Sequence, residues 1–188
     1  ELNILETLRK RNPLIICITN DVVRTFTANG LLAIGASPVM SECSEDLEDL
    51  IVHASALLIN IGTVTPDKVT YYKEAIKLAK AHEVPIVLDP VGCHDGAYRL
   101  SVVLDLIKTD AISLLRGNQS EIKAIYDALN TNHKIDRSLS GKGVDGEQVE
   151  DSAIITYRLA RQINCPVVAT GEEDYVSDGT RVFAVPLG

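Results

Sequence analysis

The strongest constraint on the fold is a series of short, largely β-branched apolar runs, each of which ends in polar residues or glycine. They are Leu14–Ile18, Ala56–Ile61, Pro85–Leu88, Ala111–Leu115 and Pro166–Ala169. Continuous apolar runs of this length are typical of parallel strands that are buried on both faces. Helical patterns separate several of the runs, and this alternation predicts crossover connections between parallel strands. The sequence therefore predicts an α/β protein with a mostly parallel central sheet flanked by helices on both faces.

Three segments between the runs are predicted to be helices. Val22–Ala33 carries apolar residues on several sides, which indicates a mostly buried helix. Pro66–Ala81 has one apolar face, with Thr65 as its N-cap and a proline in its first turn. A third helix is expected over Gln119–Leu129. Near the end of the chain, Asp178-Gly179 between two apolar runs predicts a β-hairpin.

Composition limits the class of protein. The chain has 188 residues, which fits one domain, and its apolar residues are 46% of the total while aromatics are only 4%, so the core must be aliphatic. A net charge of -8 argues against a nucleic-acid surface, because phosphate binding requires clustered Lys and Arg. No apolar run approaches the length of a membrane span and no signal peptide is recognisable at the start, so a cytoplasmic location is expected.

The cysteines and histidines show no metal-binding spacing. The four cysteines form no C-x-x-C pair, which argues against a zinc site, and a chain of this size does not need a disulfide framework. Cys17 and Cys165 lie in or beside apolar runs and are expected to be buried. Of the four histidines, His82 is expected on the surface, and only His94 lies in a loop after a predicted strand.

Some sequence fragments resemble known motifs but do not match them. Gly141-Lys142-Gly143 lacks the spacing and the following Ser or Thr of a Walker A motif. Neither H-E-x-x-H nor G-x-S-x-G is present, so metalloprotease and α/β-hydrolase functions have no support. The polar stretch from Asn130 to Glu147 is long for a plain connection and is expected to be a surface excursion or a functional flap.

Polar residues at the ends of the predicted strands are the candidates for chemistry. Asp89 follows a buried strand, where a carboxylate can hold Mg²⁺ through water or simply cap a turn. In the segment 116–121, Asn118 and Glu121 have the spacing of a capping box, which any helix could use. The same segment also places Arg116 and a carboxylate at a helix N-terminus, which favours a phosphate site with Mg²⁺. Thr170 adds a hydroxyl at a third strand end, where a plain turn is equally possible.

The order of several motifs is similar to that of a known family. The motifs are ITNDVV, FTANGLLAIGASPVMSE, LLINIGT, PIVLDPVG, RGN-x-x-E, KGVD and ATGEEDYVSDG. Together they resemble the hydroxyethylthiazole kinases of the ribokinase-like superfamily, from about Asn12 to Gly188. The resemblance implies a ribokinase-like three-layer sandwich, with residues 1–188 forming a single kinase domain that is incomplete at its C-terminus.

The resemblance also implies roles for individual residues. In such enzymes the thiazole alcohol binds near the residues that correspond here to Asn20, Met40 and Gly62. Arg116 and Thr170 correspond to residues that hold ATP. Asp89 and Glu121 correspond to residues associated with Mg²⁺.

The implied activity is the ATP-dependent phosphorylation of a thiazole alcohol in thiamine biosynthesis or salvage, by a homotrimer with substrate sites between subunits. The catalytic base of the family is expected beyond Gly188. Two alternatives are a non-catalytic binding or scaffold fragment and a related pyrimidine-alcohol kinase. The loop Cys93–Gly96 departs from the family pattern, which puts phosphate or substrate contacts at that position in doubt.

Overall fold

The computed structural model describes residues 3–130 and 147–186. The chain divides into two compact units, residues 1–89 (the N-terminal unit) and 90–188 (the C-terminal unit). Most of the predicted surface excursion, together with the Gly-Lys-Gly fragment at 141–143, lies outside the described residues.

The N-terminal unit contains four parallel strands in the order β2–β1–β3–β4. Their bounds are β1 Leu14–Ile18, β2 Ser37–Met40, β3 Ala56–Asn60 and β4 Ile86–Asp89. The register sets Cys17 beside Met40 and Asn60 beside Asp89. Because parallel strands point the same way, the residues that follow them gather at one edge of the sheet.

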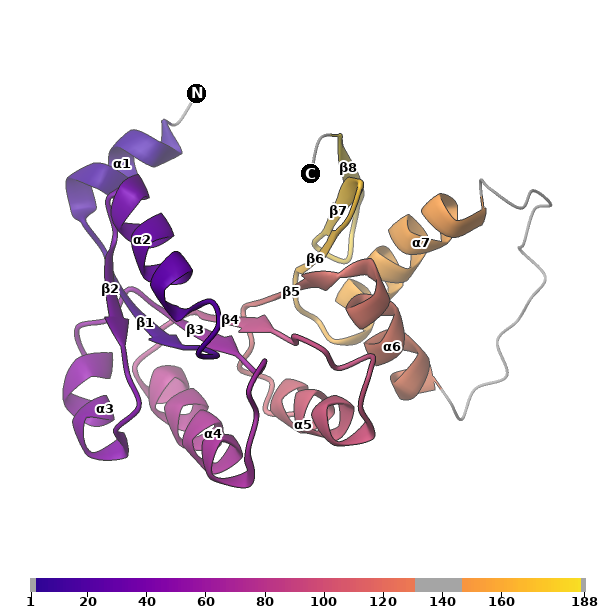
Figure 1. Cartoon of the computed structure of the whole chain (residues 1–188). Coiled ribbons are helices and arrows are strands. Elements are labelled where there is room, and N and C mark those ends of the chain that lie inside the picture. The colour runs from indigo at the N-terminus through magenta and orange to yellow at the C-terminus, as the bar shows by residue number, and fades with distance from the viewer. Residues whose placement is uncertain (1–2, 131–146, 187–188) are drawn as a thin grey trace. The chain divides into compact units, whose positions relative to one another are not determined.

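Helices cover both faces of this sheet, as predicted. In Figure 1, α1 (Ile4–Arg11) and α2 (Arg24–Ile34) lie on one side, and α3 (Ser44–Ile51) and α4 (Pro66–Ala81) lie on the other. The predicted bounds of α4 are confirmed, and its cap is the Thr65 hydroxyl, which accepts a 3.2 Å hydrogen bond from the Lys68 amide. A Pro in the first turn and a threonine cap fix the start of this helix.

The prediction of a mostly buried helix after β1 is wrong in its burial. None of the residues of α2 is buried, Phe26 is 79% exposed, and the preceding Val22 is 86% exposed. The apolar residues of α2 point in several directions, and packing against β2 and α1 covers only part of the helix. An apolar helix surface therefore remains open in the single chain.

The C-terminal unit contains β5 (Leu114–Asn118) and β6 (Val167–Thr170) in parallel, followed by the antiparallel pairs β6–β7 and β7–β8. β7 (Glu173–Ser177) and β8 (Val182–Pro186) form the predicted hairpin. Three helices accompany them, α5 (Ala97–Ile107), α6 (Gln119–Asn130) and α7 (Glu147–Gln162), and α6 packs against both α5 and α7 (Figure 1).

The predicted strand over 111–115 lies about three residues too early in the sequence. β5 continues through Arg116 and Gly117, which pair with Val168 and Ala169 of β6. Gly117 is thus inside a strand. The apolar run ends at Leu115, whereas the strand continues to Asn118 because residues 116–118 still pair with β6 through the backbone.

The core is aliphatic, as the composition predicts. The largest fully buried side chains are almost all Ile and Leu, with Tyr72 as the aromatic exception. Cys17 and Cys165 are buried as expected, and burial raises the pKa of each thiol to about 11. Among the described residues, no helix has the length and apolar character needed to cross a membrane.

Candidate functional site: an amide network at the carboxyl edge of the sheet

Three side chains form a continuous hydrogen-bonded chain at the carboxyl edge of the N-terminal sheet. The Asn60 Nδ2 amide donates to Asp89 Oδ2 at 2.8 Å, and the Asn20 Nδ2 amide donates to Asn60 Oδ1 at 2.7 Å. Both asparagines are buried, with exposed fractions of 5% for Asn20 and 6% for Asn60. Buried amides need all these partners, so the network holds both side chains in one orientation.

The network ends on the backbone of the loop that follows β1. Asn20 Oδ1 accepts hydrogen bonds from the amides of Val22 at 3.0 Å and Val23 at 3.1 Å. The Asn20 side chain folds the loop ahead of α2, and Val23 occupies the N-cap position of that helix. This arrangement sets the path of the TND segment.

Gly62 closes tightly over Asn20. Its own amide donates to Asn60 Oδ1 at 3.0 Å, and a Cβ at Gly62 would lie 2.6 Å from Asn20 Nδ2. Real Cβ atoms essentially never approach another heavy atom this closely, so only glycine fits at position 62 without displacing Asn20. Asn20 and Gly62, two of the predicted substrate residues, are thus direct neighbours.

Met40, the third predicted substrate residue, ends β2. It is half-buried and pairs in register with Cys17, three residues before Asn20. The structure therefore places Met40 at the same sheet edge as the amide network, on the strand next to β1.

In the C-terminal unit, Glu121 holds two backbone segments together. Its Oε2 accepts from the Asn118 amide at 2.8 Å while Asn118 Oδ1 accepts from the Glu121 amide at 2.8 Å, which is a complete capping box. Its Oε1 accepts from the Gly92 amide at 2.8 Å. Glu121 is only 5% exposed, so this carboxylate ties the loop after Pro90 to the start of α6.

The loop that departs from the family pattern begins at this clamp. Gly92 has a φ of +71°, a conformation that favours glycine, and the end of the Arg99 side chain lies against it, 2.7 Å from where a Cβ would be. Cys93 is buried, and the His94 ring lies 3.3 Å from the Asp95 carboxylate.

Arg116 and Thr170 lie on neighbouring strands. Arg116 is exposed on β5, and Thr170 ends β6 with its hydroxyl donating to the Gly117 carbonyl at 3.3 Å. In register, Thr170 is the partner of Asn118, two residues beyond Arg116. The structure therefore places both predicted ATP residues on one parallel pair, with Thr170 at the carboxyl end of β6 and Arg116 two residues before the end of β5.

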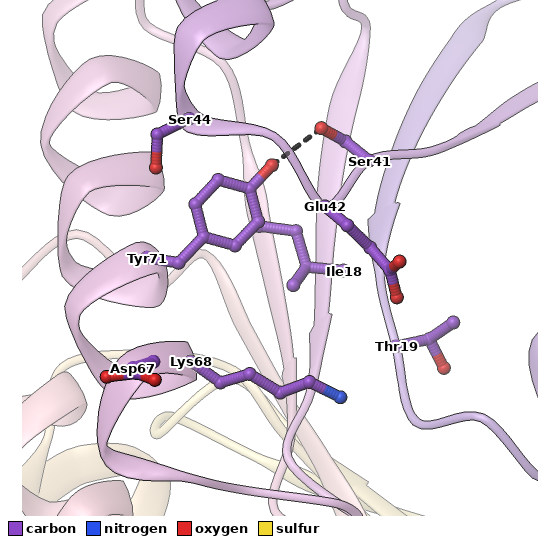
Figure 2. A pocket seen from close by; sticks show the side chains of 8 residues that line it. All are labelled: Ile18, Thr19, Ser41, Glu42, Ser44, Asp67, Lys68 and Tyr71. Carbon is purple, nitrogen blue, oxygen red and sulfur yellow. Dashed lines mark hydrogen bonds between the residues drawn. The ribbon is translucent and has the colours of Figure 1, made fainter.

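A separate cavity of ≈ 280 Å³ opens on the N-terminal unit (Figure 2). Its lining comes from the end of β1, the loop after β2 and the first turns of α4, and comprises Ile18, Thr19, Ser41, Glu42, Ser44, Asp67, Lys68 and Tyr71. None of the predicted substrate residues lines it. Since Thr19 precedes Asn20 and Ser41 follows Met40, the cavity is next to the predicted substrate segment in sequence but is formed by different side chains.

Most residues that line the cavity carry a polar group, and two of these groups are hydrogen-bonded to each other. The Tyr71 and Ser41 hydroxyls are 2.6 Å apart (Figure 2), and burial raises the pKa of Tyr71 despite this bond, so the phenol stays neutral near pH 7. The buried Thr19 hydroxyl has no hydrogen-bond partner within the described part of the protein. Glu42, on the opposite wall, is ion-paired with Arg24.

The two predicted metal residues differ in how their oxygens are used. Asp89 presents a carboxylate at the end of β4, with Oδ2 bonded to Asn60, whereas both oxygens of Glu121 accept backbone amides. No cluster of three or more His, Cys, Asp or Glu side chains suited to a metal ion occurs in residues 3–130 and 147–186. Carboxylate oxygens nevertheless fit Mg²⁺, which keeps several waters and takes only one or two protein carboxylates.

Sequence reasoning missed Asn60. It is the last residue of an otherwise apolar strand, and a polar residue in that position was the available signal. The register that sets it beside Asp89 and the loop that brings Asn20 to it become visible only in three dimensions.

Comparison with known proteins defines the class first. The structure resembles that of a ribokinase-like superfamily protein from Enterococcus faecalis V583, with a TM-score of 0.55 over 92% of this chain and 62% of that chain. At 8% identity this likeness shows the fold alone, an α/β ribokinase-like sandwich.

The sequence then defines the family. The model of the "HK: Hydroxyethylthiazole kinase family" matches residues 5–188. A hydroxyethylthiazole kinase from Streptococcus agalactiae serotype Ia is 53% identical over 92% of this chain. The structure of the hydroxyethylthiazole kinase protein from Pyrococcus horikoshii OT3 has a TM-score of 0.83 and 38% identity over 96% of this chain. The chain belongs to the hydroxyethylthiazole kinase family.

The chain is shorter than these relatives. It spans 64% of the length of the Streptococcus agalactiae protein and 64% of the Pyrococcus horikoshii chain.

Gly62→Ala tests the tight contact with Asn20. The added methyl group lies 2.6 Å from Asn20 Nδ2, and relief of this clash should cost about 1–3 kcal/mol of unfolding free energy. Urea denaturation measures the change. Gly30→Ala is the matched control, since nothing lies within 4 Å of a Cβ there, and it should be neutral or slightly stabilising in α2. Equal stability of the two variants would contradict the contact.

Glu121→Ala tests the clamp between the loop after Pro90 and α6. Removal of the carboxylate leaves the amides of Gly92 and Asn118 without acceptors, which should cost about 2–4 kcal/mol. Thermal unfolding measures the loss. Glu172→Ala removes an exposed carboxylate and should stay within about 0.5 kcal/mol of the original chain. A loss no larger than that of this control would mean that Glu121 holds neither segment.

Proposed function

We propose that this chain forms most of a kinase that transfers phosphate from ATP to the hydroxyl of 4-methyl-5-(2-hydroxyethyl)thiazole, in thiamine biosynthesis or salvage. The observation that carries the proposal is membership of the hydroxyethylthiazole kinase family, with 53% identity to a relative of that name. We further propose that residues 1–188 belong to a single ribokinase-like domain and that the protein is cytoplasmic.

The thiazole alcohol is proposed to bind at the loop that the amide network shapes. Asn20 and Gly62 fix the path of the TND segment, and Met40 at the end of β2 supplies an adaptable apolar contact for the ring. Buried hydrogen bonds hold the loop in one conformation before the substrate binds. This favours recognition of a small substrate, because binding then costs little loop entropy.

ATP is proposed to bind at the ends of β5 and β6. The exposed Arg116 guanidinium suits a phosphate, since it offers several N–H donors in a fixed fork, and Thr170 adds a hydroxyl. Asp89 and Glu121 are the proposed residues for Mg²⁺, with contact through water where their oxygens already accept amides. When bound, the ion would supply positive charge that offsets the charge on the phosphates.

The general base is proposed to lie in the part of the relatives' length that this chain does not span. Phosphoryl transfer depends on positioning and charge stabilisation, with one residue to orient or deprotonate the attacking hydroxyl. The residues proposed above can position the substrates, and the Arg116 guanidinium supplies positive charge. Tyr71 is unsuitable as a base, because burial raises its pKa and keeps the phenol protonated.

A comparison of two chain lengths tests the proposed activity. The 188-residue chain and a form extended at its C-terminus to the length of the relatives are each assayed for ATP-dependent phosphorylation of the thiazole alcohol. We expect turnover by the long form and roughly 10²–10⁴-fold less by the short form, the usual contribution of a general base. Comparable turnover by the short form would rule out the scaffold-fragment alternative. Preferential competition by a pyrimidine alcohol would favour the alternative substrate class.

We also propose a homotrimer in which α2 contributes to the contact between subunits. The support is the exposed apolar surface of this helix and its entry, which includes Phe26, Leu32 and Val22. Burial of such side chains stabilises association by about 25 cal/mol per Å² of apolar surface. Surfaces of this kind on a single chain commonly mark contacts between proteins.

Phe26→Glu tests the proposed subunit contact. Because Phe26 is 79% exposed in the single chain, the substitution should change its unfolding free energy by less than about 0.5 kcal/mol while it lowers the assembly mass measured by light scattering. Val52→Glu, at a residue that is 49% exposed beyond α3, is the control and should leave the mass unchanged. An original chain that is monomeric, or a Phe26→Glu variant that keeps the full mass, would contradict the proposal.

A further inference from the structure

We propose that Asn60 is a positioning residue that fixes the substrate loop by the direction of its hydrogen bond to Asp89. The inference rests on the proposed function for its meaning in substrate binding. Asn60 contributes no atom to the reaction in this proposal, and it acts through Asn20 and Gly62.

The direction of the network follows from the carboxylate. Asp89 in its ionised form can only accept hydrogen bonds, so the group that faces its Oδ2 at 2.8 Å must be the Asn60 amide nitrogen. This places the Asn60 oxygen on the opposite side, where it accepts from both Asn20 Nδ2 and the Gly62 amide. A flipped Asn60 would set an oxygen against a carboxylate oxygen and would lose both bonds.

The same constraint passes to the second asparagine. Since Asn20 Nδ2 is committed to Asn60, its Oδ1 faces the loop and accepts from the amides of Val22 and Val23. One carboxylate on β4 thereby determines the orientation of two side chains and of the backbone that leads into α2. The residues from the loop after β1, from β3 and from β4 act as one unit, although Asn20 and Asp89 are 69 positions apart in the sequence.

Exchange of the two functional groups tests this direction. In the double variant Asn60→Asp with Asp89→Asn, residue 60 still accepts from Asn20 and Gly62, and its second oxygen now accepts from the amide introduced at 89. The loop is therefore expected to keep its structure, while the carboxylate has moved from β4 to β3. In Asn60→Asp alone, two carboxylates face each other at the former hydrogen-bond distance. In Asn60→Leu, all the side-chain hydrogen bonds of residue 60 are lost.

Two readouts are measured on the chain and its variants. The first is hydrogen exchange at the Val22 and Val23 amides, and the second is affinity for the thiazole alcohol by calorimetry. We expect at least about tenfold faster exchange and tenfold weaker binding in Asn60→Asp and Asn60→Leu, with both values restored to within about threefold in the double variant. Asp89→Asn alone should keep the slow exchange, because the new amide can turn its oxygen toward Asn60.

The controls separate failure of this inference from failure of the proposed function. Asn3→Asp makes the same chemical change at the N-cap of α1, where either side chain accepts the Glu6 amide, and should change neither readout. If the double variant exchanges as fast as Asn60→Asp, Asn60 does not act through its bond to Asp89. If the original chain does not bind the thiazole alcohol, the proposed substrate is wrong, and hydrogen exchange still tests the network.

Discussion

The N-terminal unit depends on the hydrogen bond between the Asn60 amide and the Asp89 carboxylate. Parallel pairing of β3 with β4 puts these two residues side by side, and the bond then fixes a row of buried polar groups that would otherwise be costly. Both lone pairs of each asparagine oxygen are used, by Gly62 and Asn20 in one case and by two loop amides in the other. The loop after β1 is thus held by buried side-chain hydrogen bonds, although it lies outside the paired strands.

The C-terminal unit uses a carboxylate for a similar purpose. Glu121 accepts hydrogen bonds from backbone amides in both the loop after Pro90 and the start of α6. Gly117 leaves room for the Glu121 side chain, since a Cβ at position 117 would lie 3.0 Å from Glu121 Oε2. The capping interpretation of Asn118 and Glu121 is therefore confirmed, while the proposed metal role remains a prediction. Both can hold for one carboxylate, because two oxygens offer about four acceptor positions.

Local signals predicted some elements well. The start of α4 was predictable because Thr65 and Pro66 specify a helix start chemically, and the β7–β8 hairpin was predictable because Asp178-Gly179 favours a tight turn. The strand ends that carry Asp89 and Thr170 followed from the apolar runs before them.

Other features depend on partners that a pattern does not reveal. The end of β5 is set by pairing with β6, the exposure of Phe26 by how little of α2 meets its neighbours, and the role of Asn60 by the register of β3 on β4. α1, α3, α5, α7 and β2 were not predicted. The strand ends that carry Asp89, Met40 and Thr170 lie where the apolar runs and the resemblance put them, and the functional roles of these residues stay predictions. The amide network that connects Asn20 to Asp89 could not be predicted from the sequence, because it depends on residues far apart along the chain.

The β8 strand has a consequence for the behaviour of the chain in solution. Within residues 3–130 and 147–186 it pairs with β7 alone, all five of its residues are exposed, and its sequence VFAVP contains no charge. Charged residues on an edge strand normally discourage intermolecular pairing, and here a terminal proline is the only comparable obstacle. β8 is therefore suited to pair with a further strand through backbone hydrogen bonds, a kind of contact that differs chemically from helix contacts through α2.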